Sequence, residues 1–166
     1  MRLRRGSYII YNGKETMLYR DGVINKLVIP LYDDDFIDDK CIKDEWGGYI
    51  RPVTPDEIGN IRSVRPYAIY KGHKVALRGS RIAEKMAITP TSMDNEDYEE
   101  TMKVLGIQHE YNGEDTVFVP IKDLDIYERV KYYDRYKYFK GIYKPYKIED
   151  YHVIIKDDEL HRYKVK

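Results

Sequence analysis

Residues 11–18 read Tyr-Asn-Gly-Lys-Glu-Thr-Met-Leu, and residues 111–118 read Tyr-Asn-Gly-Glu-Asp-Thr-Val-Phe. A looser copy, Tyr-Lys-Gly-His-Lys-Val-Ala-Leu, lies between them at residues 70–77. Asn-Gly between two apolar runs is the strongest short signal for a β-hairpin, because both central residues of a type I′ turn need positive φ. The stretch therefore predicts three hairpins, each with its glycine in the turn.

The first copy extends into a three-stranded meander. Strands are expected at Ser7–Tyr11 and Lys14–Arg20, on either side of the Asn-Gly turn. The pair Asp21-Gly22 predicts a second turn of the same kind, and a third strand, Val23–Ile29, is expected to stop at Pro30. Both faces of this meander are partly apolar, so we expect a sheet that is covered on both sides or curled into a small barrel.

The same order of strands and turns recurs around the second copy. The spacing from Tyr11 to Tyr70 nearly equals the spacing from Pro30 to Pro90, so the two units align with about one inserted residue. This agreement favours an internal repeat.

One helix is expected near residues 94–105. Asp94 can cap its start, Tyr98 and Met102 share a face, and Gly106 stands where a left-handed cap is expected.

These signals predict a mainly β protein with minor α content. Repeated antiparallel hairpin or meander units would form SH3-like small barrels or one curled sheet, with the single helix packed against it. A last hairpin is expected around the turn residues Asp157-Asp158. Two domains are predicted, 1–62 with the first meander and an acidic loop, and 63–166 with the second meander, the helix and Tyr/Lys-rich hairpins. One continuous domain is the alternative.

Composition narrows the functional classes. Lys plus Arg and Asp plus Glu each number 29, so no global field attracts nucleic acid or an anionic membrane. Eighteen tyrosines point first to pleated, half-buried surfaces and second to a binding face. Cys41 is the single cysteine, and no Cys/His spacing is typical of a zinc site. The sequence has neither an apolar signal core nor an apolar run of membrane length, so we expect a cytoplasmic protein with no membrane partner. Release without a cleaved signal is the alternative. We also expect no cofactor.

The first candidate site is an acidic loop followed by the only tryptophan. An EF-hand is excluded, because Asp38 stands where the loop needs glycine and Asp44 where it needs glutamate. A solvated loop is the simple interpretation, and an acidic face for a basic partner is the functional one. Trp46 is interpreted either as a core plug or as a binding hot spot. The candidate protein-binding residues are Asp33, Asp34, Asp35, Asp38, Asp39, Trp46 and Tyr49.

The second candidate site is the basic, tyrosine-rich segment 127–147. Stacking rings and cations in a groove hold single-stranded nucleic acid without reading its sequence. Alternating Tyr and Lys along 136–140 would equally protect an edge strand from association. The candidate nucleic-acid-binding residues are Arg129, Lys131, Tyr133, Arg135, Tyr136, Lys137 and Tyr138.

The sequence contains no recognisable catalytic motif. The histidines His73, His109 and His152 could meet only if distant segments pack together, and Cys41 should stay protonated among carboxylates. We therefore name no catalytic and no metal-ligating residue. The function expected is a non-enzymatic protein-binding module, of the immunity, inhibitor or regulatory adaptor type. A single-stranded nucleic-acid-binding protein is the first alternative, and a metal-dependent hydrolase is the second.

Overall fold

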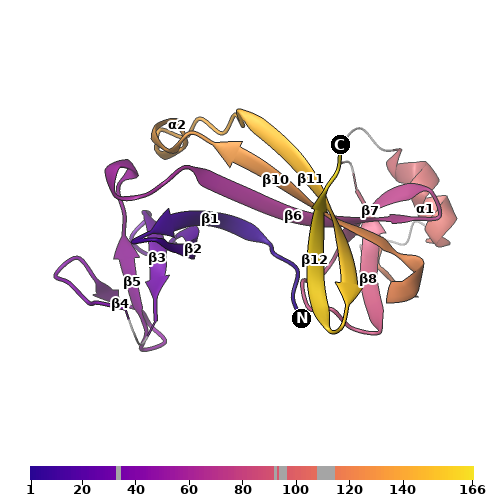
Figure 1. The fold of residues 1–166 in the computed structure, drawn as a ribbon, viewed down its shortest axis with the longest axis horizontal. Coiled ribbons are helices and arrows are strands. Elements are labelled where there is room, and N and C mark those ends of the chain that lie inside the picture. The colour runs from indigo at the N-terminus through magenta and orange to yellow at the C-terminus, as the bar shows by residue number, and fades with distance from the viewer. Residues whose placement is uncertain (33–34, 92, 94–96, 108–114) are drawn as a thin grey trace. The chain divides into compact units, whose positions relative to one another are not determined.

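The computed structural model describes residues 1–166 except 33–34, 92, 94–96 and 108–114. In this part of the chain, twelve strands form one large antiparallel sheet (Figure 1). The strands are β1 (Gly6–Tyr11), β2 (Lys14–Arg20), β3 (Leu27–Leu31), β4 (Ile42–Lys43), β5 (Tyr49–Pro52), β6 (Ile61–Tyr70), β7 (His73–Leu77), β8 (Lys85–Pro90), β9 (Val117–Pro120), β10 (Asp125–Tyr133), β11 (Lys147–Lys156) and β12 (Glu159–Lys164). The described helices are α1 (Tyr98–Leu105), α2 (Arg135–Phe139) and the short 3₁₀ turns η1 (Pro55–Glu57) and η3 (Ile121–Asp123).

The mainly β architecture is confirmed, whereas barrels are not found among the described strands. The sheet runs in the order β12-β11-β10-β6-β1-β2-β3-β5-β4, with β7 to β9 branching from β6. It stays open because the hairpins add to one another edge to edge instead of each closing on itself. None of the described helices is long and apolar enough to cross a membrane.

The chain divides into two compact units. Unit 1 contains residues 1–5, 65–129 and 149–166, and unit 2 contains residues 6–64 and 130–148. Strands β6, β10 and β11 contribute residues to both. The predicted domains, 1–62 and 63–166, stay a prediction.

Unit 2 starts with the hairpin that the repeated stretch predicts. β1 and β2 pair with Tyr11 opposite Lys14 and Ile9 opposite Thr16. Asn12 and Gly13 have φ of 49° and 75°, as a type I′ turn requires. The core of this unit joins residues from the start of the chain to aromatic side chains of β10 and α2, and comprises Ile9, Leu18, Leu27, Ile29, Val53, Ile58 and Ile61 with Tyr11, Leu31, Tyr133, Tyr138 and Phe139 packed against them.

The third strand of the meander differs from its prediction. It begins at Leu27 instead of Val23, because the Asp21 carboxylate accepts hydrogen bonds from the backbone N–H groups of Val23 and Ile24 and holds a longer loop. Pro30 lies inside β3 and does not stop it. The pairing of β3 with β2 ends at its second residue, so the rest of β3 is an edge on that side, where a missing N–H is tolerated.

Unit 1 contains the hairpin of the second copy, the predicted last hairpin and the predicted helix. Lys71 and Gly72 have φ of 49° and 80° between β6 and β7, so this hairpin has the same turn as the first. The last hairpin, β11–β12, turns at Asp157-Asp158, which also have positive φ. The third copy of the repeated stretch, with Gly113, lies largely outside the described residues, so its turn stays a prediction.

The predicted helix is α1. Its N-cap is Asp97, whose carboxylate accepts hydrogen bonds from the N–H groups of Glu99 and Glu100, and Gly106 takes the left-handed cap with φ of 70°. Asp94, the predicted cap, lies outside the described residues. The helix covers a core formed mostly by β6–β10, whose buried members are Leu3, Ala68, Val75, Leu77, Met86, Ile88, Val119, Leu124, Ile126 and Val153.

Candidate protein-binding site

Residues 32–48 connect β3 to β5 in unit 2, and we call them the aromatic–acidic segment. Their sequence holds seven acidic residues against two lysines. β3 and β5 pair directly, with Leu31 opposite Tyr49, and β4 adds to the far side of β5 through Ile42 and Lys43. The segment therefore starts and ends on adjacent strands, so its two ends are fixed by the sheet.

A tight turn between β4 and β5 presents Trp46. The Asp44 carboxylate accepts hydrogen bonds from the backbone N–H groups of Trp46, at 2.9 Å, and Gly48, at 2.8 Å. Gly47 has φ of 85°, a conformation that glycine adopts without strain. The Trp46 side chain is 87% exposed, so its interpretation as a core plug is wrong.

The buried side chain of Arg51, in β5, holds the middle of the segment through ion pairs. Only 6% of its side chain is exposed, and its Nε donates to Asp38 at 3.1 Å while its Nη1 donates to Glu57 at 2.6 Å. Its guanidinium also lies 5.5 Å from the centre of the Tyr11 ring. A buried cation between two carboxylates ties the segment to η1 and to the first hairpin.

Hydrogen bonds and ion pairs within this cluster shift the pKa values of its members. A hydrogen bond from the Cys41 thiol, followed by the bond from Arg51, lowers the pKa of Asp38 despite its partial desolvation. Desolvation works against a charged Arg51, but its hydrogen bonds to Glu57 and Asp38 outweigh this and raise its pKa. Burial and the hydrogen bond to Asp38 raise the pKa of the Cys41 thiol. The thiol is therefore protonated near neutral pH, in agreement with the sequence, and is a poor nucleophile.

A second anchor holds the start of the segment. The Asp35 carboxylate accepts a hydrogen bond from the N–H of Tyr32 at 2.7 Å and lies 3.7 Å from the Lys14 ammonium. That ammonium lies 5.3 Å from the centre of the Tyr32 ring. Asp35 and Asp38 thus serve mainly to order the backbone, whereas Asp39 is exposed to solvent. Asp33 and Asp34 lie outside the described residues.

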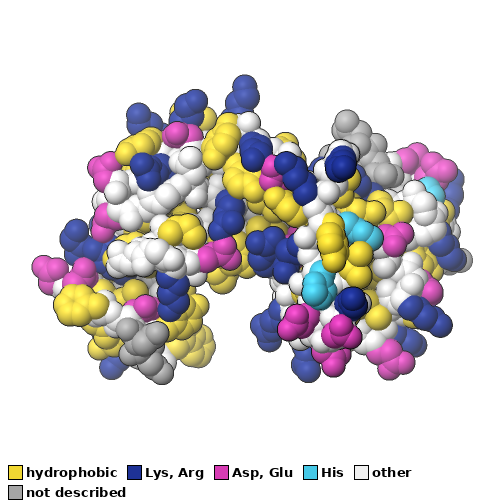
Figure 2. All heavy atoms as spheres, in the orientation of Figure 1, with side chains coloured by type: hydrophobic (Ala, Val, Ile, Leu, Met, Phe, Trp, Pro, Cys, Tyr) yellow, Lys and Arg dark blue, Asp and Glu magenta, His cyan; other side chains and the backbone are white. Residues whose placement is uncertain are grey.

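The segment exposes large apolar side chains between its carboxylates. Phe36, like Trp46, is 87% exposed, and the other exposed apolar residues of the segment are Tyr32, Ile37 and Ile42. Figure 2 shows hydrophobic and acidic side chains next to one another at the end of unit 2 formed by β4 and β5. Trp46 was predicted from the sequence, whereas Phe36 was not, although an apolar residue inside a run of aspartates was an available signal. Tyr49, also named, is half-buried in β5.

The basic, tyrosine-rich segment does not form the predicted edge strand over 136–140. Arg135–Phe139 is helix α2, because the Asp134 side chain caps its start by accepting from the N–H of Lys137. Lys137 is exposed and Lys131 is half-buried. The segment therefore alternates between strand, helix and loop, and its tyrosines do not follow one strand.

Most candidates on that segment are held by protein groups. Arg129 donates two hydrogen bonds to Asp150, at 2.8 and 2.9 Å, and Arg135 donates to the Ile58 carbonyl. The Tyr136 hydroxyl donates to Asp56 at 2.9 Å. Tyr133 and Tyr138 contact each other edge to face and pack against the core of unit 2. The rings that would stack on bases are therefore partly covered.

The histidines show no metal-binding arrangement in the described part of the chain. His152 stacks on Tyr127, with ring centres 4.9 Å apart, and His73 lies in β7. His109 lies outside the described residues. No group of three or more His, Cys, Asp and Glu side chains is arranged to hold a metal ion among the residues that the structure describes.

The matched family covers the candidate site. Residues 3–103 match the family described as uncharacterised conserved protein UCP033725. The chain belongs to this family. The match includes the whole aromatic–acidic segment and leaves out the basic segment 127–147. Neither the search of curated proteins nor the search of solved structures found a match.

Proposed function

We propose that this chain is a non-enzymatic protein-binding module whose aromatic–acidic segment binds a basic surface of another protein. The observation that supports the proposal most is the pair Phe36 and Trp46, each 87% exposed on a segment that ion pairs and turns hold in place. Exposing aromatic rings to water is unfavourable in free energy, and exposed rings on an ordered backbone are typical of interface hot spots.

The energetics of such a site favour tight binding. An aromatic side chain buries about 150–250 Å² at an interface, and each hot-spot ring contributes about 2 kcal/mol or more. The turn at Asp44 and the ion pairs of Arg51 already order the backbone, so less conformational entropy is lost when a partner binds.

The charge of the segment defines the partner. Asp39 and Glu45 are exposed beside the apolar residues, and among the described residues neither makes an ion pair. A partner with Lys and Arg around an apolar pocket would complement them, and the carboxylates would speed its association at low salt. An immunity, inhibitor or regulatory adaptor role is part of this proposal, and so is a cytoplasmic location.

The two alternatives have less support. Nucleic-acid binding through 127–147 would require Arg129 and Arg135 to leave the protein acceptors they already contact. A metal-dependent hydrolase would require ligands that the described residues do not bring together.

The test compares a double variant with a matched control. Phe36→Ala/Trp46→Ala removes both exposed rings, whereas Phe118→Ala removes a ring that is 71% exposed in unit 1. Proteins captured from the source cells by the wild-type chain are identified and purified, and their affinities are measured by calorimetry. We expect the double variant to lose at least about a hundredfold in affinity and Phe118→Ala to lose less than about threefold.

Salt provides the second readout. Affinity should fall as ionic strength rises, because exposed carboxylates lose their attraction for a basic partner beyond a Debye length of about 8 Å at physiological salt. Equal binding by the double variant and the wild type would refute the site. A salt-dependent shift of a labelled single-stranded oligonucleotide, abolished by Lys137→Gln, would favour the nucleic-acid alternative instead.

A further inference from the structure

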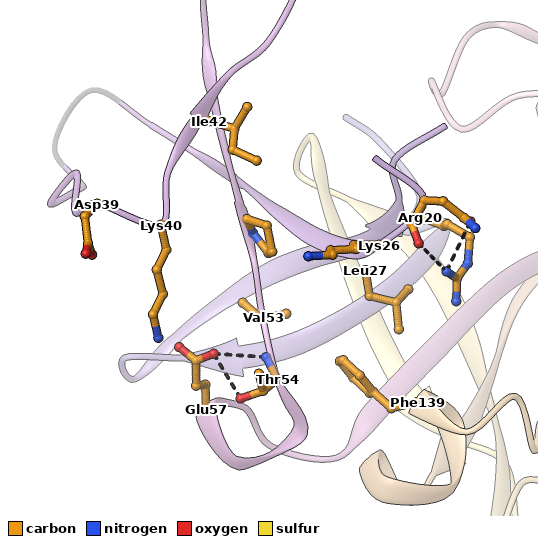
Figure 3. A pocket seen from close by; sticks show the side chains of 12 residues that line it. Arg20, Lys26, Leu27, Asp39, Lys40, Ile42, Val53, Thr54, Glu57 and Phe139 are labelled. Atoms are coloured by element: carbon orange, nitrogen blue, oxygen red, sulfur yellow. Dashed lines mark hydrogen bonds between the residues drawn. The ribbon is translucent and has the colours of Figure 1, made fainter. Parts of the chain in front are cut away.

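A cleft of about 670 Å³ opens in unit 2 beside the aromatic–acidic segment (Figure 3). Its lining comes from the loop between β2 and β3, from the end of β5 and η1, from the segment itself and from α2. Pockets that hold small organic ligands have volumes of about 300–1,000 Å³, so this one is of suitable size.

The floor of the cleft is apolar. Leu27, Val53 and Phe139 belong to the core of unit 2, and their side chains point toward one another at the base of the cleft in Figure 3. Ile42, which is exposed on β4, forms part of the opposite wall. This floor offers a ligand contact with the carbon atoms of apolar side chains.

Cations line the side of the cleft. The Lys26 side chain points into it, and Arg20 lies at its rim, where Nη1 donates to the Asn25 carbonyl at 3.1 Å. No carboxylate pairs with Lys26 or Arg20 among the residues that the structure describes. In Figure 3 the Lys26 ammonium points away from the Arg20 guanidinium, so Lys26 alone stands beside the apolar floor without a counterion among the described residues and is suited to hold an anion.

The acidic residues of the lining do not cancel this charge. Glu57 is held by Arg51 at 2.6 Å and by the N–H and hydroxyl of Thr54, both at 3.0 Å. Asp39 lies at the outer edge of the cleft, away from Lys26, in Figure 3. Lys40, from the same side as Asp39, adds a third cation to the lining.

We propose that this cleft binds a small organic carboxylate with an aromatic or aliphatic body. The carboxylate lies against Lys26, and the apolar body covers Leu27, Val53 and Phe139. Arginine and lysine form charge-assisted hydrogen bonds to carboxylates, which are about twice as strong as neutral ones. The apolar body contributes about 25 cal/mol for each Å² that it removes from water. Lys26 and the floor lie outside residues 32–48, and Phe36 and Trp46 do not line the cleft, although Asp39, Lys40 and Ile42 of that segment do.

Three ligands of the same shape and different charge test the proposal. They are 2-naphthoate, 2-naphthylmethanol and 2-naphthylmethylammonium, titrated into the ¹⁵N-labelled full chain at low salt. We expect naphthoate to bind at least about tenfold more tightly than the neutral alcohol, and the ammonium to bind most weakly. The amide shifts should be centred on residues 20–27, 52–57 and 139. Absence of naphthoate binding, equal binding of all three ligands, or shifts centred elsewhere would overturn the proposal.

Variants separate charge from apolar contact. Lys26→Gln should weaken naphthoate binding about tenfold and leave the alcohol unchanged, whereas the matched control Lys122→Gln, on an exposed lysine of unit 1, should change neither. Phe139→Leu keeps an apolar side chain on the floor and should weaken both ligands alike. If Lys26→Gln and Lys122→Gln behave identically, the cation does not hold the ligand and the assignment is wrong. The Phe36→Ala/Trp46→Ala variant should bind naphthoate normally, so failure of one proposal leaves the other testable.

Discussion

Each unit of this chain has a buried ionic centre, and the two centres have opposite signs. In unit 1 a carboxylate, Glu128 of β10, lies between Arg4 and Arg162 and is 0% exposed. In unit 2 an arginine, Arg51 of β5, lies between Asp38 and Glu57. Both centres satisfy a buried charge with two partners of the other sign, which is the arrangement that such burial requires.

The centres differ in what they hold. Glu128 accepts the backbone N–H of Arg4 at 2.8 Å and four guanidinium hydrogen bonds from Arg4 and Arg162, at 2.7–3.1 Å. It thereby joins residues near both ends of the chain to one central strand. Arg51 instead joins a loop and a 3₁₀ turn, and so orders a surface. The same arrangement of charges therefore links strands in unit 1 and orders an exposed surface segment in unit 2.

The largest effect is expected at Glu128. Glu128→Gln keeps the shape but leaves two arginines facing a neutral amide, and we expect the free energy of unfolding to fall by about 3 kcal/mol. Urea denaturation measures it, with Glu159→Gln, an exposed glutamate of β12, as the control. The Trp46 fluorescence anisotropy should not change, because the tryptophan belongs to unit 2. A loss below about 1 kcal/mol would mean that this centre contributes no more than a surface pair.

Lowering the pH should reduce the contribution of the Glu128 centre to the free energy of unfolding. Burial alone would raise the pKa of Glu128, but hydrogen bonds from Arg162 and Arg4 outweigh it and hold the pKa below its ordinary value of 4.5. A carboxyl group with a depressed folded pKa stabilises the fold above its unfolded pKa, and this stabilisation is lost as pH falls through the folded value. Unfolding free energies measured between about pH 6 and 3 should therefore decline, and more steeply for the wild type than for Glu128→Gln. Parallel slopes would contradict this assignment.

A smaller loss of stability is expected at Arg51. Arg51→Met retains the buried stem, and its former partners Asp38 and Glu57 are partly exposed and can be hydrated, so we expect a loss of about 2 kcal/mol. Here the Trp46 anisotropy should fall as well, because the segment loses its anchor. Arg81→Met, on an exposed arginine, serves as the control. Unchanged anisotropy would show that the ion pairs of Arg51 do not order the segment.

The smallest effect is expected at the turn itself. Asp44→Ala removes the acceptor of two backbone hydrogen bonds and should cost about 1 kcal/mol locally, with little change in global unfolding. The anisotropy of Trp46, the only tryptophan, should fall and the affinity for a captured partner should drop. The neighbouring Glu45→Ala should leave the anisotropy unchanged. Equal effects of the two variants would mean that charge, and not the turn, positions Trp46.

Sequence reasoning was most successful where structure depends on near neighbours. The hairpin turns at Gly13 and Gly72 and the helix end at Gly106 were predicted, because each follows from a backbone conformation that these residues favour. It was less successful over Arg135–Phe139, where alternating Tyr and Lys suggested a strand. The signal for a helix was Asp134, a good N-cap, and the packing of Phe139 against the core of unit 2 supports it.

The candidate site was predicted only in part. Its acidic and aromatic character could be read from composition, so Asp38 and Trp46 were named. Arg51 was missed, because nothing in the local sequence marks an arginine that will be buried between two carboxylates. Phe36 was missed, because its exposure depends on what packs around it.

The sequence by itself therefore determined the hairpins that turn at Gly13, Gly72 and Asp157-Asp158, since hairpins and caps depend on φ, ψ and contacts a few residues apart. It did not determine the longer loop after Asp21 or the pairing of strands that no tight turn joins. Only the tertiary structure decided that residues 130–148 join residues 6–64, that Arg51 is enclosed and that Trp46 faces water. Burial is a property of packing between segments far apart in the chain, and it decides which side chains stabilise the fold and which are left exposed to solvent.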